Sequence, residues 1–134
     1  MPSPTLSVAE MKDITRRYAA EPWNDGKFDI FDEACSPDFR LGEDMTVAQL
    51  KQIIADYRKG VPDLQNVLGK IIVEGDAVAF RWTMTGTHLG EYLGIAPTGK
   101  KIKATGITII HFRDGKIYRD EFESGSPSFA DQVK

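Results

Sequence analysis

The 134-residue chain has little cysteine, little histidine and no excess of positive charge. Its single cysteine, Cys35, excludes an internal disulfide framework and fits a reducing compartment. The two histidines, His88 and His111, have no cysteine or carboxylate at a recognised ligand spacing. No glycine-rich phosphate loop follows a strand and opens a helix. We therefore expect no metal site and no dinucleotide site.

Charge and hydropathy exclude further classes of protein. The 17 basic and 20 acidic residues give a net charge of -3, so we expect neither nucleic acid nor a membrane as a partner. No apolar run approaches the ~20 residues needed to span a bilayer. The first residues, Met1–Thr5, begin no secretory signal. We expect a cytoplasmic protein with a single domain over residues 1–134.

The first half of the chain predicts three helices. Ser7 and Glu10 form a capping box ahead of an apolar stripe that reaches residue 18. After the break at residues 23–26, a short helix is expected over Lys27–Ala34. A second capping box, Thr46 with Gln49, begins a third helix that ends near residue 60.

The second half predicts four strands, which are Leu64–Val73, Ala77–Gly86, Lys100–Phe112 and Lys116–Ser124. The tight turn at residues 113–115 joins the last two as a hairpin. Helices followed by an antiparallel sheet predict an α+β fold in which the helices cover one sheet face. A long, twisted sheet wrapped on helices leaves a cone-shaped cavity, which is the usual place for a small-molecule site.

Alternation along the strands predicts which residues face this cavity. Val78, Phe80, Trp82 and Met84 form the larger apolar set of their strand and should point inward. In the last strand, alternation places Asp120 inward together with two aromatic residues, while Glu121 and Glu123 point outward. Burial should raise the pKa of Asp120, which suits an acid or base near neutral pH. Alternatively, Asp120 is hydrogen-bonded within the core and only shapes it.

Several stretches carry a family resemblance. Residues 81–101, RWTMTGTHLGEYLGIAPTGKK, resemble the signature of the SnoaL-like polyketide and ester cyclases, as do residues 73–81, Pro62-Asp63 and residues 112–117. The resemblance implies the cone-shaped fold of nuclear transport factor 2 and dimers formed through the outer sheet face. It also implies catalysis without metal or organic cofactor, in which an aspartate of the last strand closes a ring on a flat polyketide.

One departure from the family pattern concerns that aspartate. When the chain is aligned on Gly115-Lys116-Ile117, the family's catalytic position falls on Phe122, and its supporting polar residue falls near Thr108. Asp120 lies two residues earlier on the same face. It either supplies a displaced carboxylate, or the cyclase reaction is absent.

We expect Asp120 and His88 to be catalytic, although His88 alternatively only fixes the turn of its loop by hydrogen bonds. Residues expected to contact the ligand are Tyr18, Trp23, Tyr57, Trp82, Thr108, Tyr118 and Phe122. The predicted function is cofactor-independent cyclisation, isomerisation or hydrolysis next to a carbonyl of a small hydrophobic molecule. The alternative is a non-catalytic ligand-binding or dimeric interaction domain on the same fold. A homodimer through the outer sheet face is expected in either case.

Overall fold

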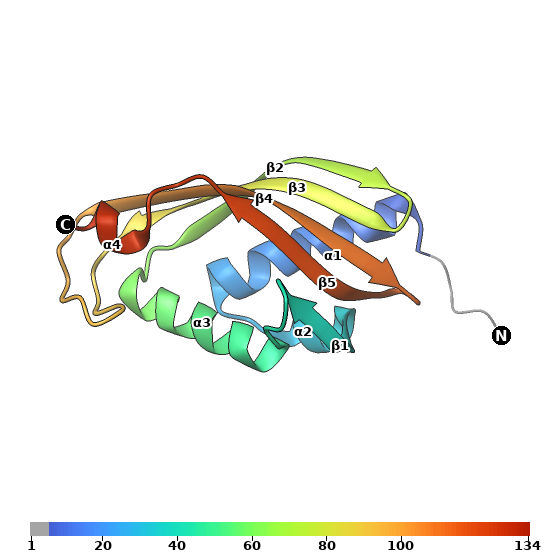
Figure 1. The fold of residues 1–134 in the computed structure, drawn as a ribbon, viewed down its shortest axis with the longest axis horizontal. Helices are drawn as coiled ribbons and strands as arrows, with labels where there is room; N and C mark the ends of the chain where they lie inside the picture. The colour runs from blue at the N-terminus through green and yellow to red at the C-terminus, as the bar shows by residue number, and fades with distance from the viewer. Residues whose placement is uncertain (1–5) are drawn as a thin grey trace.

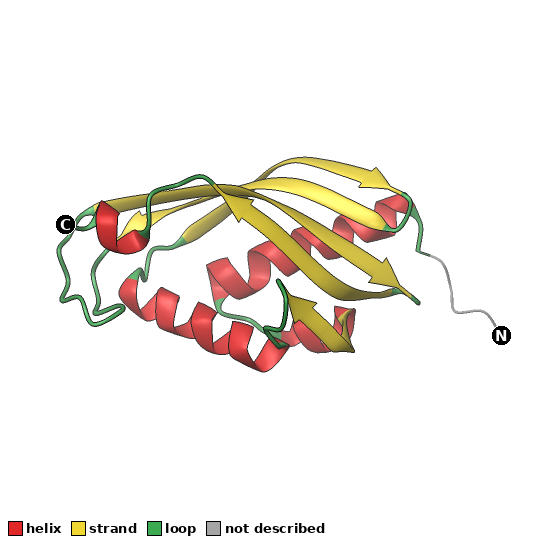
Figure 2. Ribbon diagram, in the orientation of Figure 1, coloured by secondary structure: helices red, strands yellow, loops and turns green. Residues whose placement is uncertain are grey.

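The computed structural model describes residues 6–134, so the expectation for Met1–Thr5 lies outside the described residues. Helices cover one face of a curved five-stranded sheet, as Figure 1 shows. Figure 2 shows the same separation of a helical layer from a strand layer. The predicted α+β architecture is therefore confirmed. No helix within residues 6–134 is both long and apolar enough to cross a membrane.

The helical elements are α1 (Val8–Ala20), the π-helical turn η1 (Glu21–Asp25), α2 (Asp29–Ala34), α3 (Val47–Gly60) and α4 (Phe129–Gln132). Both predicted capping boxes are present. The Ser7 hydroxyl accepts from the Glu10 N–H at 3.1 Å, and the Ser7 N–H donates to the Glu10 carboxylate at 3.0 Å. Thr46 and Gln49 form the same pair of bonds at the start of α3. The helix starts are thus set by local hydrogen bonds.

The break after α1 lies where the sequence predicts it. The chain continues through η1, and Gly26 then turns it with a φ of +68°, which is the left-handed region that glycine adopts readily. The next helix begins at Asp29 instead of Lys27. The turn places Trp23 in the wall of a cavity between the helices and the sheet, and Asn24 accepts a hydrogen bond from the Asn66 N–H.

The strands are β1 (Cys35–Leu41), β2 (Gln65–Glu74), β3 (Ala77–Thr87), β4 (Lys101–Arg113) and β5 (Lys116–Ser124), in the spatial order β1-β5-β4-β3-β2. The four predicted strands are present with small changes at their ends. All neighbours pair antiparallel except β1 and β5, which run parallel.

Two elements are absent from the sequence prediction. The sequence predicts no strand after the helix that ends at Ala34, but Cys35–Leu41 forms β1, which pairs with β5 at the edge of the sheet. Proline is tolerated there because an edge strand has backbone groups that need no ladder partner. Helix α4 is a single short turn capped by Ser128.

The inner face of the sheet carries the predicted apolar set. Val78, Phe80, Trp82 and Met84 are all buried against the helices. The side chain of Phe39 from β1 joins this core and is 1% exposed. Full burial of each large apolar side chain stabilises the fold by about 1.5–3 kcal/mol, so the alternation in β3 determines which face is inward.

The outer face of the sheet also carries apolar residues. Ile107 and Ile109 of β4 are 54% and 40% exposed, and Val67 and Ile72 of β2 are 62% and 53% exposed. We call these four side chains the outer patch, since the helices lie along the opposite face of the sheet (Figure 2). Ile107 and Ile109 therefore point away from the inner face of the sheet.

A β-bulge changes the start of β5. Ile117 pairs with Phe112, but Arg119 pairs with His111, so Tyr118 is the extra residue on β5. Ile117 is therefore buried instead of facing outward. From Asp120 onward the alternation follows the prediction, with Asp120 inward.

Candidate functional site

A cavity of about 330 Å³ lies between the inner sheet face and the helices. We call it the cone cavity. Its walls are mainly apolar and aromatic. The apolar side chains come from Ala19, Phe31, Leu41, Leu50, Ile53, Phe80, Met84 and Ala104. A small number of polar groups on such walls is typical of a site that orients a small molecule.

Asp120 is the only carboxylate that lines the cone cavity within residues 6–134. Its side chain comes from β5, pairs in register with Ile110, and is 5% exposed. The Tyr18 hydroxyl of α1 donates a hydrogen bond of 2.5 Å to Asp120 Oδ2. Asp120 Oδ1 has no hydrogen-bond partner among the described residues. One carboxylate oxygen is therefore positioned by the protein, and the other is buried without a donor among the described residues.

Burial dominates the electrostatics of this pair. Loss of solvent raises the pKa of Asp120 from 3.8 to about 6, although the Tyr18 hydrogen bond lowers it in part. Burial, together with the Asp120 charge, raises the pKa of Tyr18 well above its usual value of 10.0. Tyr18 thus stays protonated and remains a donor. Burial and the nearby Asp120 also raise the pKa of the Cys35 thiol to about 12, which makes Cys35 a poor nucleophile.

Six of the seven residues predicted to contact a ligand line the cone cavity. They are Tyr18, Trp23, Tyr57, Trp82, Thr108 and Phe122. Trp82 donates from Nε1 to the Thr108 hydroxyl at 2.9 Å and meets Phe122 edge to face, with ring centroids 6.5 Å apart. Phe122 lies where the family acid was expected and faces the same cavity as Asp120. These walls are flat and aromatic, which suits a flat ligand.

His88 does not line the cone cavity, contrary to the prediction that it acts there. It follows the end of β3, is fully buried, and accepts a hydrogen bond at Nδ1 from the Thr98 N–H at 3.3 Å. Gly86 pairs with Ile102, while Asp120 pairs with Ile110. That spacing of eight residues corresponds to roughly 25 Å of strand. The structure therefore places His88 as a residue that holds the loop.

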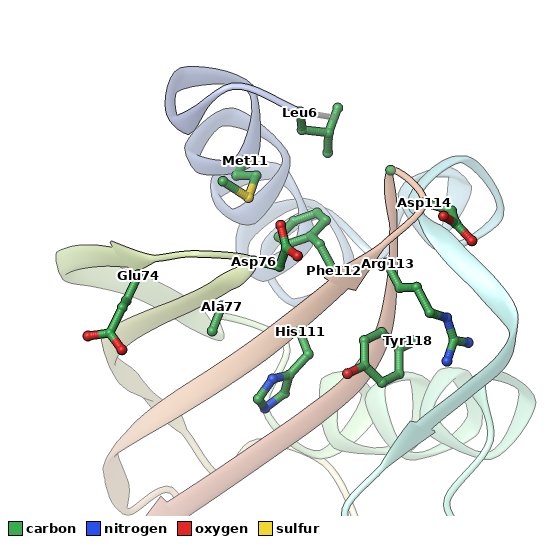
Figure 3. Close-up of a pocket in the computed structure, with 11 residues that line it drawn as sticks. Leu6, Met11, Glu74, Asp76, Ala77, His111, Phe112, Arg113, Asp114 and Tyr118 are labelled. Atoms are coloured by element: carbon green, nitrogen blue, oxygen red, sulfur yellow. The ribbon is translucent and has the colours of Figure 1, made fainter. Parts of the chain in front are cut away.

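Tyr118 also lies outside the cone cavity, because the bulge turns it away. Figure 3 shows Tyr118 beside Arg113, with His111 nearby, at the hairpin end of the sheet. The Arg113 guanidinium carbon lies 4.3 Å from the centroid of the Tyr118 ring, which is a cation–π contact. The predicted ligand contact by Tyr118 in the cone is thus wrong, since an inserted residue reverses the alternation before it.

The groove in Figure 3 is larger than the cone cavity, at about 500 Å³. Exposed charged side chains such as Glu74, Asp76 and Arg113 contribute to its walls. The cone cavity has a buried carboxylate between aromatic walls, whereas exposed charged and apolar side chains together line this groove. We therefore assign the candidate site to the cone cavity.

Sequence reasoning did not name Asn66 or Tyr92 as residues of the cone cavity. Asn66 of β2 is 6% exposed and faces inward opposite Met84. Tyr92 of the loop after β3 packs edge to face on Tyr57, with ring centroids 5.0 Å apart. Asn66 gave no signal by alternation, because the register of β2 shifts between Leu68 and Ile71. Tyr92 gave no local signal, because loop packing depends on tertiary contacts.

No group of three or more His, Cys, Asp or Glu side chains that could hold a metal ion occurs in the described part of the chain. The side chains of the cone cavity offer a single carboxylate with hydroxyl, amide and indole groups. This arrangement can hold a small molecule and move a proton through Asp120.

Comparison with known proteins gives a family match. The model of the SnoaL-like polyketide cyclase family matches residues 12–121. Over 43 residues, 32% of this chain, the sequence is 44% identical to aklanonic acid methyl ester cyclase AcmA of Streptomyces galilaeus. That match spans only 30% of the length of AcmA. It is therefore a local similarity to a named cyclase.

Two solved structures share the whole fold. AclR of Streptomyces galilaeus, described as a candidate hydroxylase, is 30% identical with a TM-score of 0.78 over 89% of this chain and 77% of AclR. A protein of Jannaschia sp. CCS1, assigned to the SnoaL-like polyketide cyclases, is 24% identical with a TM-score of 0.79 over 97% and 96% of the two chains. The second likeness shows the fold alone. Since the family model covers well over half of its residues, this chain belongs to the SnoaL-like polyketide cyclase family.

Proposed function

We propose that this chain is a cofactor-independent cyclase-type enzyme that uses Asp120 as its acid–base group. The observation that supports this most strongly is the buried Asp120 carboxylate, which Tyr18 holds through Oδ2 while Oδ1 stays free of protein partners. A pKa of about 6 leaves the carboxylate about nine-tenths ionised at pH 7. A base with such a pKa is suited to neutral pH. Asp120 thus takes the part that the family pattern gives to position 122.

The proposed reaction is an intramolecular aldol closure. Asp120 Oδ1 removes a proton from a carbon next to a substrate carbonyl, and Tyr18 continues to donate to Oδ2. The resulting enolate carbon attacks a second carbonyl carbon of the same molecule, so one carbon–carbon bond forms. Asp120 then returns its proton to the new alkoxide oxygen. The product is an isomer of the substrate, and no cofactor is consumed.

The name of the similar cyclase supplies the first compound to test, which is aklanonic acid methyl ester. A cyclised product would have the same mass as this substrate. The likeness to AclR makes a hydroxylated product the second candidate, and that product would be heavier by one oxygen atom. Binding without any product would instead favour the non-catalytic ligand-binding domain.

The pH dependence of turnover gives a direct test of Asp120 as a base. We expect kcat/KM to rise with pH, to change slope at an apparent pKa of about 6, and to level off above it, because only the ionised carboxylate accepts a proton. Initial rates from pH 4.5 to 8.5 measure this. A rate that stays constant or falls across pH 6 would contradict the assignment.

Tyr18→Phe is the companion variant. The Tyr18 hydrogen bond lowers the pKa of Asp120, so its removal should move the rising limb of the profile to higher pH. A role of Tyr18 in packing alone would lower the rate at all pH values without moving the limb.

We also propose a homodimer formed through the outer patch. The patch places four exposed apolar side chains on the face that the helices leave uncovered, and exposed apolar clusters of this kind mark interfaces. In a symmetric dimer, the outer patch of one copy would pack against the outer patch of the other.

Ile107→Asp combined with Ile109→Asp should give a monomer in sedimentation experiments. Val8→Asp is the control, since Val8 is 53% exposed but lies on α1. A monomeric wild-type protein at micromolar concentration would refute the dimer.

A further inference from the structure

Asn66 carries the second buried oxygen of the cone cavity that has no partner. Its Oδ1 accepts no hydrogen bond within residues 6–134, although the residue is only 6% exposed. A buried acceptor without a donor is costly, so such an atom in a native site calls for an explanation. No step of the proposed reaction uses it.

The position of Asn66 is held from several directions. Its Nδ2 donates to the Ala19 carbonyl at 3.0 Å, which requires the amide nitrogen to face α1. Asn24 accepts from the Asn66 N–H at 2.5 Å and donates to the Asn66 carbonyl at 3.1 Å. With its backbone and its amide nitrogen both held, the side chain presents Oδ1 as a preformed acceptor.

The cross-strand neighbours of Asn66 on the inner face have no side-chain donor. It pairs with Met84, which in turn pairs with Ala104, and all three residues line the cone cavity. The Trp82 indole, which lines the same cavity, already donates to Thr108. A donor for Oδ1 must therefore come from what occupies the cavity.

Asn66 and Asp120 lie at different ends of the cavity lining. Asp120 pairs with Ile110 of β4. Asn66 pairs with Met84, which in turn pairs with Ala104 of β4, and each such set of paired residues forms one row across the sheet. Residues 104, 106, 108 and 110 of β4 all point to the inner face. The row of Asn66 and the row of Asp120 are therefore six residues apart along β4. Each row contains one oxygen that lacks a protein donor, and aromatic walls lie between them.

We propose that Asn66 Oδ1 accepts a hydrogen bond from a substrate hydroxyl remote from the reacting carbons, and so selects hydroxylated flat aromatic substrates over O-methylated ones. This inference rests on the proposed function, because it assumes that the cone cavity is the substrate site. A hydroxyl donates one hydrogen bond, whereas a methoxy group donates none and leaves Oδ1 unpaired. Sites that read a hydroxyl with a buried polar group discriminate strongly against its absence.

The test measures binding of two probes, 2-hydroxyanthraquinone and 2-methoxyanthraquinone, by quenching of the fluorescence of Trp23 and Trp82, which line the cavity. We expect wild-type protein to bind the hydroxyl probe at least about tenfold more tightly. Asn66→Ala should bring the ratio close to one. Gln65→Ala is the control on the same strand, because Gln65 is exposed, and it should keep the wild-type ratio.

An unchanged ratio in Asn66→Ala, or a wild-type ratio near one, would overturn the proposal, as would failure of the wild-type protein to bind either probe. Asn66→Ala also removes the bond to Ala19, so a measurement on wild-type protein accompanies it. In ¹⁵N-labelled protein, the side-chain amide signal of Asn66 should shift with the hydroxyl probe and much less with the methoxy probe. Equal shifts would overturn the proposal. Neither readout involves turnover, so a failure of Asp120 as a base would leave this result unaffected.

Discussion

Replacing Asp120 by asparagine should lower kcat by about 10²- to 10⁴-fold, which is the usual contribution of a positioned acid–base group. Asparagine has nearly the same shape, and its Oδ1 can still accept the Tyr18 hydrogen bond, but it cannot take a proton from carbon. The affinity for the probes should change little, because the aromatic walls remain. Steady-state kinetics together with fluorescence titration measure the two quantities separately.

Matched variants of the three carboxylates of β5 identify which one is needed for activity. Glu121 and Glu123 lie on the same strand but are exposed, and Glu121 instead pairs with His111 at 2.8 Å. Glu121→Gln and Glu123→Gln should each keep activity within a few-fold of the wild type, since neither side chain lines the cavity. Retention of most activity in Asp120→Asn would refute the assignment. An equal loss in all three variants would point to net charge instead of position.

The part of the site that could be predicted rests on local rules. Alternation places Asp120 and Phe122 on one face, and the structure confirms this because β5 is regular beyond Asp120. The inward set of β3 follows in the same way, since one face contains the large apolar residues. Capping boxes located the starts of α1 and α3 because they need only residues three positions apart.

The errors arose where distant parts of the chain decide the structure. The bulge that turns Tyr118 outward depends on how β5 meets β4, and single-strand alternation contains no sign of it. Strand β1 forms because β5 offers it a free edge, although its own sequence contains Pro37. His88 was placed at the cavity from its type and loop position, whereas its hydrogen bonds to the loop hold it elsewhere.

Asn66 illustrates a different limit. Its inward direction depends on the register shift of β2 between Leu68 and Ile71, and its significance depends on the hydrogen bonds that Asn24 and Ala19 make with it. These contacts join residues more than forty positions apart. Only the folded chain shows that one oxygen of this amide remains without a donor.

The same Asp120→Asn variant should show a pH-dependent gain in stability. The pKa of Asp120 is 3.8 when solvated and about 6 in the fold, so the folded state holds its proton more tightly than the unfolded state does. Stability contributed by the protonated carboxyl is therefore fully present below pH 4 and is lost as the pH rises through 6. Asparagine does not ionise, and the variant escapes this loss.

Between pH 3.5 and pH 7.5, the unfolding free energy of Asp120→Asn should therefore rise relative to wild type by about 3 kcal/mol, or roughly 10 °C in the midpoint. The comparison across pH matters more than either value alone, because any cost of the new amide is nearly the same at both pH values. Denaturant titrations at the two pH values measure it, with Glu123→Gln as the control for loss of one negative charge. A difference that does not vary with pH would show that Asp120 is not held in a desolvated environment. It would also remove the physical basis for its use as a base near neutrality, because the same burial both destabilises the ionised carboxylate and makes it basic.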